Sequence, residues 1–278
     1  MIAKKYKTLL DKIEPFVFSN SDNFSFMEKN IFDKDLTTFF DCKSTTSEPF
    51  YKLLRTTDKL AFSDQGMAME GWVYFDCSSM PGAIIGFGIH KEDLPESLRA
   101  EFDIDPNYNG LVPISMFIAI PTMNKLWIAH NLSSLRSRLG DSFGGLGLLT
   151  KAFGIKVLKI KQMYGATQWG SDAIFVHSKL AAMQILSART PVHTYINTMS
   201  YFSDYSEIDK VLSEEQAESD DFDFLIGATD TAGQISLQEK IENGDEFTLI
   251  GKPINKDDDI YYKIKISKSG IIKKTHNT

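Results

Sequence analysis

The chain has 278 residues, 42% of them hydrophobic and 24% charged, which is the composition of a soluble globular protein with a substantial core. Its net charge of −7 argues against a nucleic-acid-binding protein, because such proteins carry an excess of basic residues for phosphate contacts. Two cysteines, Cys42 and Cys77, are too few for a disulfide framework and are expected to be unpaired.

Two further features bear on location. The most apolar stretch, Leu111–Ile120, is far shorter than the roughly 20 residues that span a bilayer, so no membrane span is expected. The charged residues near Met1 are not followed by the apolar run of a signal peptide. We therefore expect a cytoplasmic protein, and export without a cleaved signal stays open as an alternative.

The sequence of the first half of the chain predicts helices followed by strands. Helical spacing of apolar residues predicts a helix over residues 2–13, and a shorter helix is expected around Phe26–Phe32. Ser47-Glu48-Pro49 predicts the start of another helix, because proline suits the first helical turn. From Gly66 onward we predict two hairpins and a short intervening helix: strands Ala68–Cys77 and Gly82–Ile89, helix Leu94–Phe102, strands Leu111–Ile120 and Lys125–Asn131.

The second half predicts further strands around one acidic segment. A glycine-rich loop and short helix are expected over Asp141–Phe153. Ser203–Asp223 contains nine acidic residues and one lysine, and predicts a short amphipathic helix that runs into a solvated acidic loop. The predicted strands are Lys156–Met163, Ala173–Val176, Pro191–Tyr201, Phe222–Ala228, Ile235–Ile241, Glu246–Ile250 and Ile260–Ile266.

Hairpins outnumber strand–helix–strand units in this pattern. The expected fold class is therefore α+β, with a mostly antiparallel sheet built from hairpins and short helices packed on it. We expect residues 1–278 to form a single domain, and the acidic segment 204–223 is the one place where a boundary fits.

The middle of this acidic chain is cationic. Residues 106–203 contain nine lysines and arginines but only two acidic residues, Asp141 and Asp172. Charge of one sign around a concavity raises the local concentration of its counter-ion. The sequence therefore predicts a cationic central pocket that binds an anionic small molecule, with Arg136 and Arg138 contributing charge. The alternative is that the acidic flanks pack against this basic middle.

A glycine-rich loop lies inside the cationic region. It reads Ser142-Phe143-Gly144-Gly145-Leu146-Gly147, between a predicted strand and a predicted helix. Glycines let backbone N–H groups approach a phosphate, and the following helix N-terminus favours an anion. The loop resembles the acyl-CoA-binding loop of the GNAT family of N-acetyltransferases, in which Gln or Arg precedes x-x-Gly-x-Gly/Ala; here Ser142 takes that first place. The resemblance implies an acyl-CoA ligand, and glycines used only for turns or packing are the alternative.

Lys151 follows the loop in the apolar setting Leu148-Leu149-Thr150-Lys151-Ala152-Phe153. A lysine desolvated by apolar neighbours loses affinity for its proton and can form a Schiff base with a carbonyl substrate. Hairpins around such a lysine are similar to the architecture of acetoacetate decarboxylases, but the Glu and Pro-Lys-Lys of that family are missing, so the family is not assigned. A solvated helix lysine is the alternative.

Three histidines complete the candidate site. His130 and His177 are expected at strand ends and His193 inside a strand, where imidazoles can act as general acid or base. Structural histidines that donate to nearby carbonyls are the alternative. No His-x-x-x-His spacing occurs, and Asp257-Asp258-Asp259 lacks the alternation of a calcium loop, so no metal site is expected. Trp169, in a loop with few charges, suits either a pocket rim or the edge of a sheet.

These residues support several functions. The first is binding of an anionic small molecule, with group transfer from an acyl-CoA, phosphate or carboxylate substrate if the protein is an enzyme. Gly144, Gly145 and Gly147 would hold the anion, and His130 or His177 would move the proton. The second is a non-enzymatic protein that docks a protein partner through the acidic segment and the Phe-rich N-terminal region. The third is a decarboxylase-like enzyme that uses Lys151.

Overall fold

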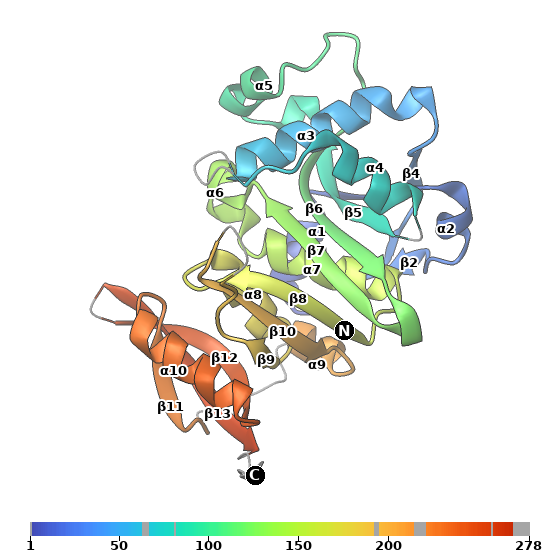
Figure 1. The fold of residues 1–278 in the computed structure, drawn as a ribbon. Coiled ribbons are helices and arrows are strands. Elements are labelled where there is room, and N and C mark those ends of the chain that lie inside the picture. The colour runs from blue at the N-terminus through green and yellow to red at the C-terminus, as the bar shows by residue number, and fades with distance from the viewer. Residues whose placement is uncertain are drawn as a thin grey trace, which may run out of the picture. The chain divides into compact units, whose positions relative to one another are not determined.

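A computed structural model describes residues 2–62, 67–80, 82–191, 195–213, 221–256 and 258–268 of the chain. The chain divides into two compact units between Lys161 and Gln162. Figure 1 labels most helices and strands of both units. Each unit has its own hydrogen-bonded strands and its own buried cluster.

The first unit, residues 1–161, contains five strands that pair in the order β7–β6–β5–β1–β4, antiparallel except for β1 with β4. A separate antiparallel pair is formed by β2 and β3. The strands are β1 (Glu14–Ser19), β2 (Asn30–Ile31), β3 (Lys34–Asp35), β4 (Thr38–Asp41), β5 (Ala83–His90), β6 (Leu111–Pro121) and β7 (Trp127–Ser134). The helices are α1 (Lys4–Leu10), α2 (Ser21–Ser25), α3 (Glu48–Phe62), α4 (Gly71–Ser79), α5 (Glu96–Phe102), α6 (Arg136–Leu139) and α7 (Leu146–Val157).

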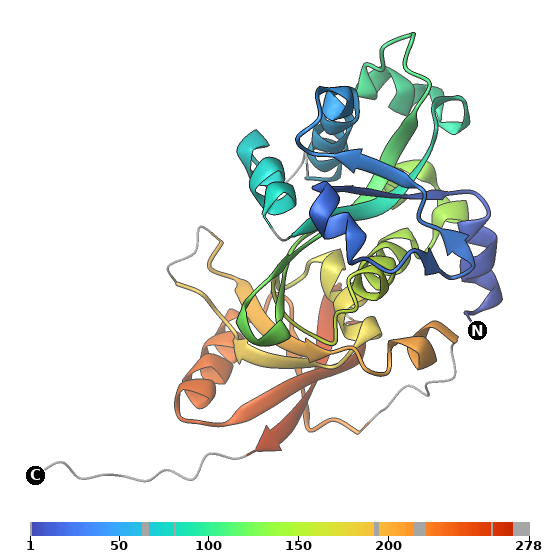
Figure 2. The same cartoon turned by 90° about the vertical axis from the view of Figure 1, so that its right-hand side faces the viewer.

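Strand β6 is covered on both faces, because successive side chains of a strand point in opposite directions. Met116 and Ile118 belong to the buried cluster on the side of α3 and α4. Ser115 and Phe117 point the other way, toward α7: the Ser115 hydroxyl lies 2.7 Å from that of Thr150. Figure 2 shows α3 and α4 on one side of β5 and β6 and α7 on the other. A strand buried on both faces reads as a continuous apolar run, as Leu111–Ile120 does.

The second unit, residues 162–278, is also an antiparallel sheet with helices. Its strands pair in the order β8–β10–β9–β12–β13–β11. The strands are β8 (Gln162–Gln168), β9 (Met183–Ser187), β10 (Thr198–Asp204), β11 (Phe224–Gly227), β12 (Glu246–Lys256) and β13 (Asp259–Lys268), and the helices are α8 (Asp172–Leu180), α9 (Ile208–Ser213) and α10 (Thr231–Glu242).

The α+β class with a mostly antiparallel arrangement of strands is confirmed. The predicted hairpin of Leu111–Ile120 with Lys125–Asn131 is present as β6 and β7, and α3 begins at Glu48, as Pro49 indicates. Both cysteines are free, as expected. Helix α9 buries Ile208, Val211 and Leu212 at the start of the acidic segment, whose residues 214–220 lie outside the described ranges. No helix in the described ranges is long and apolar enough to cross a membrane.

Several strand predictions were wrong because the residue types of strands occurred at helical spacing. Trp72-Val73-Tyr74-Phe75 favours a strand by composition, yet the segment is α4 and buries Tyr74, Cys77 and Ser78, three and four residues apart. Ile235–Ile241 lies in α10 and Ala173–Val176 in α8, each capped by an aspartate or serine side chain at its N-terminus.

Two smaller predictions also failed. The helix expected around Phe26–Phe32 is replaced by the earlier helix α2 and the strand β2, with Phe32 and Asp33 at positive φ in the turn to β3. The strand expected over Lys156–Met163 begins only at Gln162, because α7 continues to Val157 and Lys159 takes a φ of 54° in the turn that follows.

Candidate functional site

The glycine-rich segment connects β7 to α7. Helix α6 ends at Gly140, which has a φ of 86°, and α7 begins after Gly145, which has a φ of 92°. Side chains rarely tolerate such values, so glycine is needed at both bends. The two bends turn the chain so that α7 packs back on β5 and β6. This packing is close at Gly154, because a Cβ added there would lie only 2.6 Å from the Phe117 ring.

The start of α7 has the features of an anion site. The first four N–H groups of a helix have no partner within it, and the helix dipole adds positive potential there. Gly145 occupies the N-cap and caps no N–H with a side chain, and no acidic residue lies in the first turn. Gly144 is exposed, and Gly145 and Gly147 are half-buried. The exposed backbone of this turn is therefore at Gly144, since Leu146 and Leu148 are buried and the Tyr6 ring lies beside Gly145.

The basic residues before the loop are already paired. Arg138 donates through Nη1 to both carboxylate oxygens of Glu101, at 2.9 and 2.7 Å. Arg136 Nη2 lies 3.5 Å from Asp141 Oδ1 in an exposed pair. Ser142 is exposed in the short 3₁₀ turn Asp141–Phe143. An anion at the loop would thus compete with these carboxylates for the two guanidinium groups.

A cavity of about 440 Å³ lies against Phe143 of the loop. Its lining carries both signs of charge, from Asp11, Glu14, Asp93, Lys12, Lys34 and His90. His90 Nε2 is 3.3 Å from Glu14 Oε1. This lining would suit a ligand with groups of both charges, and none of its charged residues comes from the cationic region 106–203.

Lys151 lies one helical turn beyond Gly147 and is fully buried. Burial lowers the pKa of its amino group well below the ordinary value. The next residue toward the loop, Thr150, makes the contact with Ser115 that joins α7 to β6. Lys151 therefore belongs to the packed side of α7.

The histidines do not stand where the sequence placed them. His130 lies inside β7, whose end is Ser134, and has an exposed side chain. Desolvation still lowers its pKa, and the Asp58 carboxylate opposes this shift. His177 lies in α8 of the second unit instead of at a strand end, is buried, and has its ring centroid 5.3 Å from that of Tyr201. His193 lies outside the described residues.

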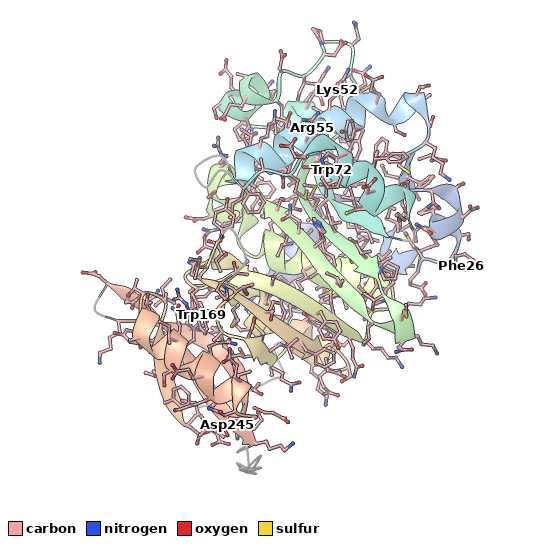
Figure 3. All side chains as sticks on the ribbon, viewed as in Figure 1. Phe26, Lys52, Arg55, Trp72, Trp169 and Asp245 are labelled. Atoms are coloured by element: carbon pink, nitrogen blue, oxygen red, sulfur yellow. The ribbon has the colours of Figure 1, made fainter. Side chains whose placement is uncertain are left out.

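Trp169 belongs to the core of the second unit (Figure 3). Its indole N–H donates to the Ala188 carbonyl at 2.7 Å, and its ring packs edge-on against Tyr262 at a centroid distance of 5.2 Å. These contacts satisfy both the polar and the apolar part of the side chain.

A buried carboxylate escaped the sequence analysis. Asp58 of α3 is fully buried, and its Oδ1 accepts hydrogen bonds from Asn131 Nδ2 and Ser133 Oγ of β7, both at 2.8 Å. Its Oδ2 accepts from the Met69 N–H at 2.7 Å. Its burial could have been inferred from its position in the sequence, because Asp58 lies one helical turn after Leu54 on the apolar face of α3.

Of the predicted site residues, the first unit contains Arg136, Arg138, Ser142, Gly144, Gly145, Gly147, Lys151 and His130, all on β7, α6, the glycine-rich loop or α7. His177 and Trp169 lie in the second unit. No group of three or more potential metal ligands occurs in the described ranges.

Comparisons with known proteins give structural similarity only. No protein-family profile and no curated protein sequence matches the chain. Among solved structures, the ribosomal-protein-S18-alanine N-acetyltransferase from Escherichia coli is similar at 9% identity and a TM-score of 0.39, over 65% of this chain and 96% of that one. An acetyltransferase of the GNAT family from Staphylococcus aureus Mu50 is similar at 11% identity and a TM-score of 0.37, over 59% and 96%. At TM-scores below 0.5, these similarities define neither the family nor the activity of the chain.

Proposed function

We propose that the chain is a group-transfer enzyme that holds the phosphate groups of an acyl-CoA-like substrate at the N-terminal turn of α7. The observation that carries the proposal is the uncapped start of this 12-residue helix, entered through Gly145 at a φ of 92°. Backbone N–H groups and the helix dipole act together on an anion at such a position. The resemblance of Ser142-x-x-Gly145-x-Gly147 to the acyl-CoA loop of GNAT enzymes supports the same ligand.

The surrounding side chains take the remaining roles. Arg136 and Arg138 supply charge once an anion competes with Asp141 and Glu101 for them. Desolvation lowers the pKa of His130, which favours the neutral imidazole that accepts the proton of an attacking nucleophile. The acyl group then passes from the thioester sulfur to that nucleophile, the C–S bond breaks, and the CoA thiolate leaves and takes up the proton that His130 accepted.

The test is a titration of the full chain with acetyl-CoA and CoA by isothermal calorimetry. Gly147→Ala places a methyl group on the half-buried turn where the phosphate would sit, and affinity should fall by roughly tenfold or more. Alanine is the better helix former by about 1 kcal/mol, so the melting temperature should be maintained. Lys156→Ala, at the other end of α7, is the matched control and should leave affinity unchanged. Equal affinity in a well-folded Gly147→Ala protein contradicts the proposal.

The burial of Lys151 favours a second candidate. Burial lowers the pKa of the Lys151 amine, which favours the uncharged form that reacts with a carbonyl substrate to give a Schiff base. Borohydride in the presence of acetoacetate should then fix a covalent adduct on Lys151, and Lys151→Arg should abolish it. An absence of adduct in the wild-type chain removes this candidate and leaves the acyl-CoA proposal untouched.

A further inference from the structure

A second cavity of the first unit lies on the face of the sheet opposite α7. It has a volume of about 280 Å³ and lies among β1, the start of α3 and α4. Its wall includes Phe18, Tyr51 and Phe75. Phe18 comes from β1, Tyr51 from α3 and Phe75 from α4, and the glycine loop contributes nothing to it. This cavity is therefore separate from the proposed acyl-CoA site.

Three aromatic residues, Phe18, Tyr51 and Phe75, line the cavity together with Cys42, Ser44, Ser47 and Glu48. Phe18 and Tyr51 have nearly parallel rings with centroids 6.2 Å apart, and Tyr51 meets Tyr74 edge-on at 5.9 Å. Phe75 is 52% exposed, although the neighbouring residue Tyr74 is fully buried. A half-exposed phenyl ring at the edge of an aromatic cavity gains apolar contact if a ligand covers it.

The polar groups of the wall are mostly engaged within the protein. The Tyr51 hydroxyl donates to the Gly71 carbonyl at 2.9 Å. Ser44 Oγ accepts from the Thr46 N–H at 3.2 Å. Glu48 Oε1 lies 2.8 Å from Lys52 Nζ in an exposed ion pair. The Cys42 thiol is in hydrogen-bond contact with Ser78. What remains for a ligand is aromatic surface and the Ser47 side chain, a set that favours a neutral apolar molecule over a charged one.

The volume of the cavity limits the size of the ligand that it can hold. An apolar cavity of about 150 Å³ is known to bind a single benzene ring. A volume of about 280 Å³ has room for a fused two-ring system. We propose that this cavity binds a neutral aromatic molecule of the size of indole, with its ring between Tyr51 and Phe75 and its edge at Ser47 and Cys42.

Cys42 provides a direct readout, because it lines the cavity and Cys77 is the other, buried cysteine. Burial raises the pKa of the Cys42 thiol, so alkylation by iodoacetamide is followed at pH 8.5 with mass-spectrometric assignment of the labelled peptide. Indole should slow the alkylation of Cys42 in a saturable manner, and saturation-transfer NMR should detect indole on the protein at the same concentrations. Indole-3-acetate, which carries a charge, should protect less.

Three variants make the test specific. Phe75→Ala removes one wall at an exposed position and should weaken indole binding by roughly tenfold. Ser47→Leu fills the cavity and should abolish protection of Cys42. Trp72→Ala is the control, since Trp72 is an exposed aromatic residue of the same helix (Figure 3) that does not line the cavity.

Three results would contradict the inference. They are an alkylation rate of wild-type Cys42 that is indifferent to indole, indole binding that survives both Phe75→Ala and Ser47→Leu, or tighter binding of indole-3-acetate than of indole. Because Phe75 is half-exposed, Phe75→Ala can be compared with wild type at equal stability, and the melting temperature of each variant checks this. Calorimetry with acetyl-CoA is independent of every one of these measurements.

Discussion

Ser133 donates its hydroxyl hydrogen to Asp58 Oδ1 at 2.8 Å across a separation of 75 residues. Both side chains are fully buried. The same carboxylate holds the Asn131 amide and the Met69 N–H, so it joins α3, β7 and the residues that precede α4. A buried carboxylate requires such donors, because an unpaired charge in the interior is strongly destabilising.

We expect Ser133→Ala to lower the free energy of unfolding by about 1.5–3 kcal/mol, since a hydrogen bond to a charged group is lost. Urea denaturation of both proteins measures the difference. The double variant with Asp58→Asn should lose less than the sum of the two single changes, because the residues share one bond. Strict additivity would show that the pair is not coupled.

Two glycines of the first unit should differ in how much stability a change to alanine costs. A Cβ at Gly86 of β5 would lie 2.0 Å from the Ser115 carbonyl oxygen and 2.8 Å from Phe16 Cζ, so Gly86→Ala should destabilise the unit by about 1–3 kcal/mol or more. At Gly144 the nearest atom, the Asp141 carbonyl oxygen, would be 3.2 Å away and φ is −54°, so Gly144→Ala should stay within about 0.5 kcal/mol of wild type. Thermal melts of the two variants provide the comparison, and similar losses would contradict it.

The Arg138–Glu101 pair gives a prediction with opposite signs at its two ends. If Arg138 contributes to anion binding, Glu101→Gln frees its guanidinium and should tighten acetyl-CoA binding, whereas Arg138→Gln should weaken it. Both effects should shrink in high salt, because the side chains are partly exposed. Affinities measured by calorimetry at low and high salt test this, and the same direction of change in both variants would exclude a role for Arg138.

Lys151 should make folding pH-dependent. Its pKa is lowered in the folded chain, so the unfolded chain binds a proton that the folded chain does not, and stability rises with pH. This group contributes up to about 1.4 kcal/mol per pH unit. Between pH 7 and 9, Lys151→Met should show a flatter dependence than wild type in urea denaturation, with Lys156→Met as the control on the same helix. Parallel curves for wild type and Lys151→Met would contradict the assignment.

Local signals in the sequence were enough for some elements and not for others. Pro49 and the apolar positions of α3 predict that helix, and the glycines predict the turn before α7. Helix α4 was not predicted because its aromatic and β-branched residues favour strands. The segment is a helix because that conformation buries Tyr74, Cys77 and Ser78 on one face.

Some features of the candidate site could likewise be predicted from the sequence, and others could not. The order of strand, glycine loop and helix depends on neighbours in the chain and could be predicted. The pairing of Arg138 with Glu101 and of Asp58 with Ser133 depends on tertiary packing, so no periodicity within one element indicates it.

Strand β6 has a consequence for how the first unit unfolds. Met116 and Ile118 are anchored in the layer of α3 and α4, while Ser115 and Phe117 are anchored against α7. One added residue between Val112 and Ser115 would turn each of these side chains to the wrong layer, because the side-chain period of a strand is two. If the helices on one face of β6 detach, that face of the strand becomes exposed. The strand is then less stable, and the helices packed on its other face lose their support. The helices on both sides of β6 should consequently be lost in a single cooperative transition.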